Sequence, residues 1–513
     1  MPHVVTQACC GDASCVYACP VNCIHPTPDE PGFGTSEMLY IDPSTCVDCG
    51  ACVSACPVGA IVPGHRLTDE QARFTDVNAA HFDPTGDGAA RFPVDPARRL
   101  PLAPIDKPHQ LAVDAPVSVA IVGSGPSAMY AADELLRQPQ ISVTVYERLR
   151  RPFGLARYGV APDHLATRSV MRLFDDIAGN PRCDIRLGTT IGRDLTLDDL
   201  RARHSAVIWA GGAPTDRRLA IDNASARGVH SATALVGWYN DHPDHDDLDV
   251  DLTTASRAVV IGNGNVALDV ARILTADPET LADTTISRHA LSALRSSSID
   301  EVVVLGRRGP THAAFTLPEL IGLVDHGANV VVDPDELAQV PAVAPADATT
   351  RAKLDLLAEV AGRTPRGGRR IRLAFHRSPA AIEVGTDGRA TGVVVAHNTV
   401  DDSGTITPTG TTETIDAGLV LTSIGYRGVA VPGLPFDDAL GVIPHEAGRV
   451  VDDGTPVLGM YVTGWIKRGP SGFIGTNKTD SAETVASLLA DLEAGLLPDR
   501  GGPRRRRMLS RLG

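Results

Sequence analysis

Several features are scarce in this 513-residue chain, and each scarcity excludes a class of protein. Aromatic residues make up only 4% of the sequence, so aliphatic side chains must build the cores. No stretch offers the roughly 18 uninterrupted apolar residues of a membrane-spanning helix, and residues 1–10 lack the basic and apolar parts of a signal peptide. Basic residues number 47 against 62 acidic ones, and the net charge of −15 disfavours nucleic-acid binding. We therefore expect a cytoplasmic protein that neither enters a membrane nor binds nucleic acid.

Cysteine is almost absent after residue 56. Of the ten cysteines, only Cys183 lies beyond that point, which excludes a redox-active cysteine pair in the rest of the chain. The others crowd into the first 56 residues, many of them at three-residue spacings. A disulfide scaffold would need a secretory context, so this crowding indicates metal ligation.

The cysteines form two copies of one template. The second copy is C-x-x-C-x-x-C-x-x-x-C-P over residues 46–57, the bacterial ferredoxin run in which the fourth cysteine binds the other cluster. The first copy, C-x-x-D-x-x-C-x-x-x-C-P over residues 9–20, has an aspartate in place of the second cysteine. Crossing the ligands predicts two sites, one of Cys19, Cys46, Cys49 and Cys52, and one of Cys9, Cys15 and Cys56 with Asp12 at the fourth corner.

The two sites are expected to hold different clusters. Four thiolates favour [4Fe–4S] at the first. The carboxylate of Asp12 is a harder and weaker ligand, so the second is predicted to hold [3Fe–4S] or an Asp-ligated [4Fe–4S] cluster. Cys10 is an alternative to Cys9, and Cys23 is left without a partner. A Cys₄ zinc site would also use paired cysteines, but zinc needs neither the duplicated template nor the Cys-Pro endings.

A strand–turn–helix pattern typical of dinucleotide binding begins at residue 117. A predicted strand over 117–122 leads into G-x-G-x-x-A at 123–128, a helix over 129–137 and a second strand over 141–146. Gly123 and Gly125 let the backbone approach a pyrophosphate at the helix N-terminus. Glu147, after the second strand, can accept hydrogen bonds from a ribose diol. FAD and NAD both fit, and the first site of a two-site flavoprotein is usually the FAD site.

The same pattern occurs a second time with a different ending. A strand over 258–261 leads into G-N-G-N-V-A at 262–267, a helix over 268–274 and a companion strand over 301–305. Arg307 and Arg308 stand where the first site has its acid. Guanidinium groups bind phosphate in bidentate fashion, so the second site is predicted to prefer NADP to NAD.

These motifs, with F-G-L-A-R at 153–157 and G-W-I-K-R-G-P-S-G-F-I-G-T-N-K at 464–478, resemble the adrenodoxin-reductase type of NADPH–ferredoxin reductase. The resemblance covers residues 117–489, and residues 1–63 look like a two-cluster bacterial ferredoxin fused in front. It implies that Glu319 lies near the nicotinamide and, with His164, is a catalytic candidate. The implied FAD contacts beyond Gly123, Gly125 and Glu147 are Ala128, Leu155, Thr189, Trp465, Gly472, Phe473 and Ile474. The implied NADP contacts beside Arg307 and Arg308 are Arg217, Asn263, Gly264, Asn265, Val266, Glu319 and the shared Gly472.

The expected fold class is an α+β two-cluster ferredoxin domain followed by an α/β flavoprotein with two Rossmann-like dinucleotide-binding domains. The NADP-binding domain is expected to be inserted in a discontinuous FAD-binding domain. The predicted bounds are 1–63 for the cluster domain, 64–114 for a linker, 115–217 and 429–495 for FAD, 218–428 for NADP, and 496–513 for a basic tail.

The resulting prediction is an NADPH-dependent ferredoxin reductase with a built-in ferredoxin. Hydride passes from NADPH to FAD, then single electrons pass to the clusters and on to a ferredoxin or a cytochrome P450-type acceptor. Two other functions stay open at this point. One is an electron-input subunit of a larger complex such as glutamate synthase, and the other is a redox sensor that binds these cofactors without turnover.

Overall fold

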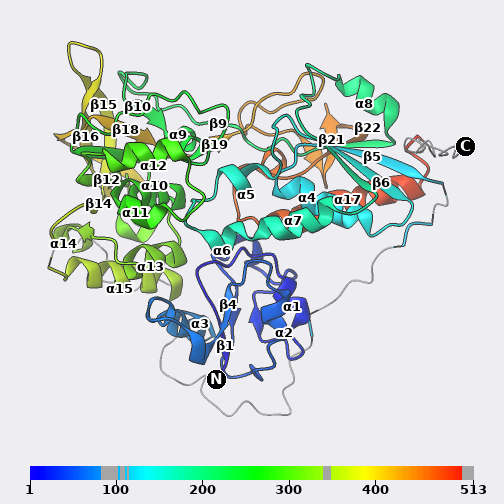
Figure 1. Ribbon diagram of the computed structural model, residues 1–513, viewed down its shortest axis with the longest axis horizontal. Coiled ribbons are helices and arrows are strands. Elements are labelled where there is room, and N and C mark those ends of the chain that lie inside the picture. Colours follow the sequence, from blue (N-terminus) through cyan, green and yellow to red (C-terminus); the bar gives the residue numbers. More distant parts are fainter. Residues whose placement is uncertain are drawn as a thin grey trace, which may run out of the picture. The chain divides into compact units, whose positions relative to one another are not determined.

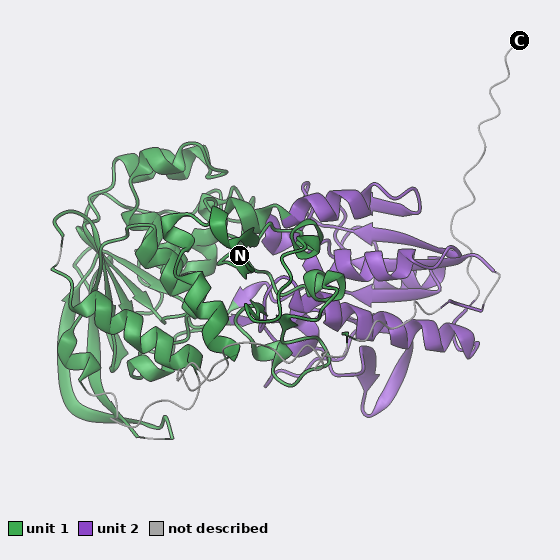
Figure 2. Cartoon of the chain, turned by 90° about the horizontal axis from the view of Figure 1, so that it is seen from below, with its two compact units in different colours: residues 1–104, 158–169, 216–425 green, residues 105–157, 170–215, 426–513 purple. Residues whose placement is uncertain are grey.

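The chain folds into two compact units, coloured separately in Figure 2. This computed structural model describes residues 1–82, 102–103, 110–112, 115–338, 348–364, 366–401 and 403–498. Unit 1 comprises 1–104, 158–169 and 216–425, and unit 2 comprises 105–157, 170–215 and 426–513. Among the helices of the described residues, none has the length and apolarity to span a bilayer. Most of the predicted basic tail, from residue 499 on, lies outside the described residues.

Residues 1–82 form the cluster module, drawn in blue in Figure 1. Its two halves repeat one another: α1 (Ser14–Ala18) and α2 (Ala51–Ala55) each follow a residue in the left-handed region. Each helix ends at a cysteine, Cys19 or Cys56, whose N–H donates back to the helix. Two short antiparallel pairs complete the module: β1 (His3–Val5) with β4 (Ile61–Pro63), and β2 (Ile24–His25) with β3 (Tyr40–Ile41).

The module extends beyond the predicted boundary at residue 63. Helix α3 (Phe74–Phe82) packs on β1 and β3 because Asn78 is buried between these strands. The Asn78 amide accepts from Val5 N–H and Ile41 N–H, and donates to the carbonyls of Val5 and Phe74. The first part of the expected linker is therefore part of the folded module, together with the 3-10 turns Gly64–Arg66 and Asp69–Gln71. Most of the remaining linker lies outside the described residues.

The rest of unit 1 is built on a six-stranded parallel sheet in the order β10-β18-β11-β12-β14-β13. Its central strands are fully buried runs of Val, Ile and Leu, as parallel strands covered on both faces require. The strands are β10 (Val229–Ser231), β11 (Arg257–Ile261), β12 (Glu301–Leu305), β13 (Val330–Val332), β14 (Arg370–Ala374) and β18 (Leu419–Thr422). A separate antiparallel sheet consists of β15 (Arg377–Val384), β16 (Ala390–Val400) and β17 (Ile406–Asp416).

The helices of unit 1 that matter below are α10 and α13, which pack on one another, and α15, which packs on α13. Their bounds are α10 (Asn265–Thr275), α13 (Leu317–Asp325) and α15 (Ala348–Ala361). The others are α6 (Leu165–Arg168), α9 (Ala232–Tyr239), α11 (Pro278–Leu281), α12 (Arg288–Arg295) and α14 (Pro334–Leu337). Residues 158–169 belong to this unit, whereas the sequence-based bounds placed them with the first dinucleotide-binding domain.

Unit 2 contains a seven-stranded sheet in the order β20-β21-β22-β8-β5-β6-β7. Five neighbouring strands, β22 to β7, are parallel, and β20 and β21 add an antiparallel edge. The strands are β5 (Val117–Val122), β6 (Ile141–Tyr146), β7 (Cys183–Arg186), β8 (Ala206–Trp209), β20 (His445–Glu446), β21 (Arg449–Asp452) and β22 (Thr455–Val462). The helices include α4 (Pro126–Leu136), α7 (Val170–Ala178), α8 (Leu197–Arg203), α16 (Trp465–Arg468) and α17 (Thr476–Glu493).

Both fingerprint helices begin earlier than the sequence pattern predicted. Helix α4 begins at Pro126 and α10 at Asn265, each directly after the second glycine of its motif. Pro126 is favourable there because the first helical residue has no partner for its N–H. The last residues of each motif are therefore the first helical turn, which brings the N-terminal N–H groups to the position that a pyrophosphate would occupy.

Candidate functional site

The first glycine of each fingerprint lies in a turn that has no space for a side chain. Gly123 has a φ of +100°, and a Cβ there would lie 2.5 Å from the carbonyl oxygen of Ala210. Gly262 has a φ of +111°, and a Cβ would lie 2.2 Å from the oxygen of Ser423. In both halves the second glycine, Gly125 or Gly264, faces open space. A pyrophosphate would fit against the bare backbone at this point, so both sites satisfy the first requirement for a dinucleotide.

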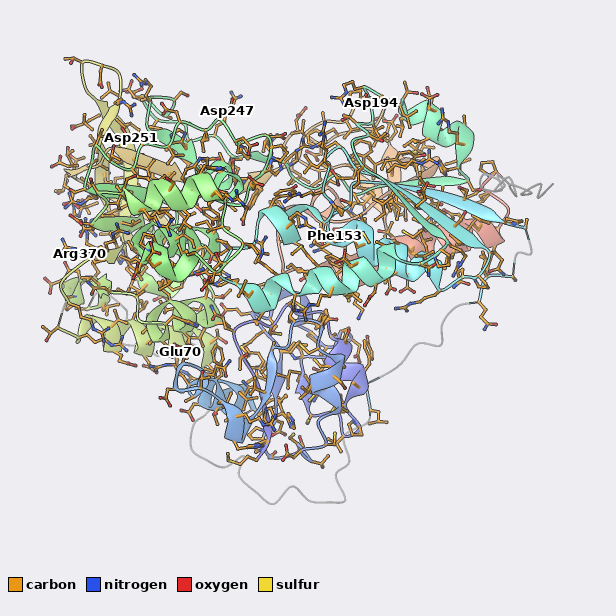
Figure 3. The ribbon with its side chains drawn as sticks, viewed as in Figure 1. Glu70, Phe153, Asp194, Asp247, Asp251 and Arg370 are labelled. Carbon is orange, nitrogen blue, oxygen red and sulfur yellow. The ribbon has the colours of Figure 1, made fainter. Side chains whose placement is uncertain are left out.

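Glu147 is buried beside the first fingerprint, with both carboxylate oxygens already bonded. Its Oε2 accepts from the N–H of Ser124 at 3.0 Å and from the Ser124 hydroxyl at 2.6 Å, and Oε1 accepts from Leu149 N–H at 2.8 Å. Ser124 Oγ also accepts from the N–H of Phe153, labelled in Figure 3. Two carboxylate oxygens offer about four acceptor positions. One position on Oε1 is left, which suffices for one hydroxyl of a ribose diol.

The segment at 464–478 is fixed against the N-terminal turn of α4. Gly464 has a φ of +82°, and a Cβ there would lie 2.2 Å from Ser127 Oγ. Ser127 Oγ donates to Asn477 Oδ1 at 2.7 Å, which joins the first turns of α4 and α17. Asp480 accepts from Gly464 N–H at 2.6 Å and pairs with the buried Lys467 at 3.1 Å. This network holds the glycine-rich loop between α16 and α17 in place.

The remaining FAD candidates occupy different environments in unit 2. Ala128 exposes none of its surface and takes part in the close helix–sheet packing expected at the third fingerprint position, so its contact with the cofactor stays a prediction. Thr189 N–H donates to the carbonyl of Glu147 at 2.8 Å, which places Thr189 beside the ribose acid. Leu155 is 37% exposed, and the Trp465 indole donates to Ser471 O at 3.1 Å. Gly472 is exposed, and Phe473 and Ile474 are half-buried.

The backbones of Arg307 and Arg308 are anchored at the carboxyl end of β12, while their side chains stay available. Asn398 Nδ2 donates to Arg307 O at 2.8 Å, and His376 N–H donates to Arg308 O at 3.2 Å. In the described part of the chain neither guanidinium is paired with a carboxylate. Two unpaired guanidinium groups at the end of this strand fit a 2′-phosphate.

The other NADP candidates lie around the second fingerprint in unit 1. The Asn265 amide oxygen accepts from Thr316 N–H at 2.8 Å and so joins α10 to the start of α13. Asn263 Oδ1 accepts from Ala314 N–H at 3.5 Å, and Gly264 and Val266 are half-buried. Arg217 is exposed, and its N–H donates to Gly425 O at 2.9 Å.

Glu319 belongs to a buried cluster of charged residues centred on Arg272. The Arg272 guanidinium forms ion pairs with Asp163 and Asp269 and lies 2.9 Å from His164 Nε2. Burial acts to lower the pKa of Arg272, but Asp269, Asp163 and Glu319 outweigh it and raise that pKa. His164, Asp269 and Glu319 could each offer one ligand atom to a metal, within 4.8 Å of one another. The guanidinium of Arg272 is already the cation paired with the aspartates of this cluster.

Burial shifts the pKa values of both catalytic candidates in the direction that favours the uncharged form of each side chain. The pKa of Glu319 is raised well above its usual range by burial and then by the nearby Asp269. Burial lowers the pKa of His164, against the opposing effect of Asp269. Glu319 Oε1 has no hydrogen-bond partner among the described residues. Glu319 is therefore a buried acid and not an exposed one on the surface of its helix.

The structure brings the cysteines together in the two crossed sets. Cys9 and Cys15 have Cys56 and Asp12 as electrostatic neighbours, and burial raises the pKa of Cys9 to about 11. Cys52 has Cys46, Cys19 and Cys49 as neighbours, and burial raises the pKa of Cys52 to about 11. Cys10 is buried beside Asp12 and Cys9. Among the described residues no three cysteine sulfurs all lie within 4.8 Å of one another. Tetrahedral zinc would need sulfurs about 3.8 Å apart, so the spacing fits a larger cluster.

Asp12 is buried and bonded within its own turn. Its Oδ1 accepts from Ser14 N–H at 3.4 Å, and its Oδ2 is in close contact with the Ser14 hydroxyl. The carboxylate thus has nearby partners that a cluster iron would have to compete with.

Cys23, which the sequence leaves without a partner, lies against two predicted ligands. Its Sγ is 3.4 Å from Cys19 Sγ, and its N–H donates to that sulfur at 3.4 Å. The Cys23 thiol lowers the pKa of Cys19 to about 6 and of Cys46 to about 5. In the other half of the repeat the equivalent residue is Ala60, whose N–H donates to Cys56 Sγ at 3.3 Å. A residue-by-residue alignment of the two halves would have shown from sequence that Cys23 stands at the position of Ala60, close to a predicted ligand.

Other residues of the site were missed from sequence. Asp269 and Arg272 lie three positions apart on α10, directly after the fingerprint, and Asp163 precedes His164. The i, i+3 spacing on a helix was an available signal for the first pair. No local pattern indicated that Asn477 would meet Ser127, because 350 residues separate them.

Two dinucleotide-binding sheets joined to a module with two thiolate sets define a pyridine-nucleotide-dependent reductase that carries its own iron–sulfur domain. Comparison with known proteins agrees. Residues 39–62 match the 4Fe-4S binding domain family, and residues 121–182 match the NAD(P)-binding Rossmann-like domain family.

Relatives that the chain matches over most of their length identify the family. The chain is 54% identical to a probable ferredoxin/ferredoxin--NADP reductase of Mycobacterium bovis, over 97% of this chain and 85% of the relative. It is 43% identical to human mitochondrial NADPH:adrenodoxin oxidoreductase, over 75% of this chain and 80% of that protein. The solved structure of Mycobacterium tuberculosis FprA in complex with NADPH matches with a TM-score of 0.70 and 42% identity, over 75% of this chain and 88% of that one. The chain belongs to the ferredoxin–NADP reductases of the adrenodoxin-reductase type, with a fused ferredoxin-like iron–sulfur domain.

Substituting the two glycines of the second fingerprint should affect different properties, NADPH binding in one case and thermal stability in the other. Gly264→Ala adds a methyl group in open space at a φ of −84°, so the protein should fold normally. The methyl group faces the expected pyrophosphate, so we expect the KM for NADPH to rise about tenfold or more. Gly262→Ala places a methyl group 2.2 Å from Ser423 O and should lower thermal stability. Steady-state kinetics and thermal melts of both variants check this, and a normal KM for Gly264→Ala would contradict it.

Proposed function

We propose that the enzyme passes hydride from NADPH to FAD and then single electrons to its own two clusters, which deliver them to a separate ferredoxin or cytochrome P450. The observation that carries this proposal is the crossed arrangement of two thiolate sets in a chain that also contains two dinucleotide fingerprints. FAD, when bound, supplies the change from a two-electron donor to one-electron carriers. Ferredoxin reduction by the related reductases supports an iron–sulfur protein as acceptor.

The chain's own residues would divide the work of binding. In unit 2, Gly123, Gly125 and Glu147 would hold the FAD pyrophosphate and ribose, and the loop at 464–478 would contact the isoalloxazine side. In unit 1, Gly262 and Gly264 would hold the NADPH pyrophosphate, and Arg307 and Arg308 its 2′-phosphate. Arg217 would be a further NADP contact. The buried cluster around Arg272 would lie at the nicotinamide end.

The order of reduction tests this path. In anaerobic stopped-flow mixing with NADPH, we expect flavin absorbance to fall first and cluster absorbance to follow, with NADH much slower than NADPH. The same experiment on the Arg307→Ala/Arg308→Ala variant should remove most of the preference for NADPH. Clusters that stay oxidised after the flavin has been reduced would rule out the internal route.

Glu319 is proposed to act at the nicotinamide as a neutral acid, with His164 supporting it through the Arg272 cluster. Because burial raises the pKa of Glu319, the residue keeps its proton to a higher pH than an exposed glutamate does. Glu319→Gln resembles the protonated form, so flavin reduction by NADPH should stay within about twofold of wild type near pH 7. At higher pH the wild-type rate should diverge from the variant, because only the wild type gains a buried negative charge. A variant that is already much slower at pH 6 would contradict a neutral Glu319.

The Asp12-containing site is proposed to hold [3Fe–4S], and the all-cysteine site [4Fe–4S]. The bonds from Ser14 to the Asp12 carboxylate support this assignment, since they compete with iron ligation. Asp12→Cys restores the full template and should replace the [3Fe–4S] EPR signal of the air-isolated protein with a second [4Fe–4S] signal after reduction. Asp12→Asn is the matched control, because it keeps the size but adds no thiolate. Two [4Fe–4S] signals in the wild type would refute the proposal.

A further inference from the structure

The cluster module contacts helix α13 of the same unit along the helix's whole length. At its N-terminus, Glu37 Oε2 accepts from Leu317 N–H at 2.6 Å. At its C-terminus, Arg73 Nε pairs with Asp325 at 3.2 Å and also binds Glu359 of α15. Helix α3 of the module lies beside α15 in Figure 1, in agreement with their contact. The module is thus docked on the helices of the NADP-binding half.

Between these two ends the module contacts helix α13 at a glycine, where the helix has no side chain of its own. A Cβ at Gly322 would lie 2.0 Å from the Gln7 amide nitrogen, so only glycine lets Gln7 approach α13 here. The apolar core continues through this contact, because Ile41 and Phe74 of the module belong to the same buried cluster as Leu320 and Leu357. Helix α13 is buried on nearly every side, from Leu317 to Val324.

Among these contacts, the one at Glu37 is best placed to couple the cluster module energetically to helix α13. A carboxylate at a helix N-terminus is favoured by the helix dipole and by the free N–H groups. Lys353 Nζ binds Glu37 Oε1 at 2.7 Å and donates to Phe315 O at 3.0 Å, so both residues hold the stretch before α13. The side chains of Glu37 and Lys353 are only 18% and 12% exposed, which limits screening by solvent.

The same helical turn carries Glu319. Thr316 caps α13 through the N–H of Glu319, and Asn265 of the second fingerprint binds Thr316 from the other side. Glu319 therefore lies two residues from the N–H that Glu37 holds, and its side chain belongs to the Arg272 cluster. A shift of the first turn of α13 would move Glu319 with it.

We propose that Glu37 of the iron–sulfur module is a positioning residue for the nicotinamide end of the NADPH site, acting through the first turn of α13. This inference rests on the proposed role of Glu319. It makes hydride transfer to the flavin depend on a side chain of the cluster module, although that module takes no part in the step. A contact that only docks the module would leave the step unchanged.

The test uses the holoenzyme with Glu37→Ala and Glu37→Gln. With NADPH in stopped flow, we expect the limiting rate of flavin reduction to fall about fivefold for Glu37→Ala, the size of a lost helix cap. Glu37→Gln should fall less, because the amide oxygen still accepts from Leu317 N–H. The affinity for 2′,5′-ADP, which occupies only the adenosine end, should stay within about twofold for both. The Arg307→Ala/Arg308→Ala variant, in contrast to the Glu37 variants, should weaken 2′,5′-ADP binding.

Glu70→Gln is the matched control. Glu70, labelled in Figure 3, pairs with His326 at the other end of α13, and both side chains are more than half exposed. An exposed pair contributes little, so Glu70→Gln should leave the limiting rate unchanged. Hydrogen exchange over residues 317–325 should be faster in Glu37→Ala than in wild type and unchanged in Glu70→Gln.

A second variant shows whether slower flavin reduction results from loss of the clusters. Lys353 lies on α15, outside the module, so Lys353→Met should slow flavin reduction while iron content and EPR signals stay normal. Wild-type limiting rates in the Glu37 and Lys353 variants would overturn the proposal, as would slowing accompanied by equally weakened 2′,5′-ADP binding. Failure of the proposed electron path looks different, because the wild-type clusters would then stay oxidised whatever residue stands at position 37.

Discussion

Both dinucleotide sites depend on one steric constraint, a turn in which the backbone passes too close to a neighbouring strand for any side chain. Gly123 follows β5 and meets the residue after β8, and Gly262 follows β11 and meets the residue after β18. The order β8-β5-β6 in one unit corresponds to β18-β11-β12 in the other. This turn fixes where each helix begins. The predicted recognition of ribose by Glu147 and of phosphate by Arg307 and Arg308 would then follow from where the second strand of each half ends.

The parts of the site that local chemistry determines could be predicted from sequence. The two thiolate templates and both fingerprints are short patterns, so each can be recognised within one short stretch of the chain. Arg307 and Arg308 can be read from sequence because they closely follow the apolar run of β12, and their role in phosphate binding stays a prediction. The bounds of the helices were less accurate, because Pro126 and Asn265 read as turn residues but occupy first helical turns.

The parts that depend on distant segments could not be predicted. Glu37 and Leu317 are separated by 280 residues, and nothing near Glu37 distinguishes it from a surface acid. The burial of Glu319 has the same origin, because it depends on helices α10, α13 and α15 packing together. The role of the linker also differs from expectation. Residues 64–82 were predicted to be part of an extended linker with room for one short helix, which α3 is, but Asn78 and Arg73 hold these residues against the module and α13.

The continuous apolar core that joins the module to the rest of unit 1 makes the two parts depend on one another. Fused domains are often treated as exchangeable parts joined by a flexible segment. Here, removing residues 1–82 would uncover the faces of α13 and α15 that Gln7, helix α3 and the turn Asp69–Gln71 contact. A shortened reductase would present an apolar patch to water and be prone to aggregation unless that patch were redesigned. Residues 1–82 and the rest of unit 1 thus share one apolar core and form one compact unit.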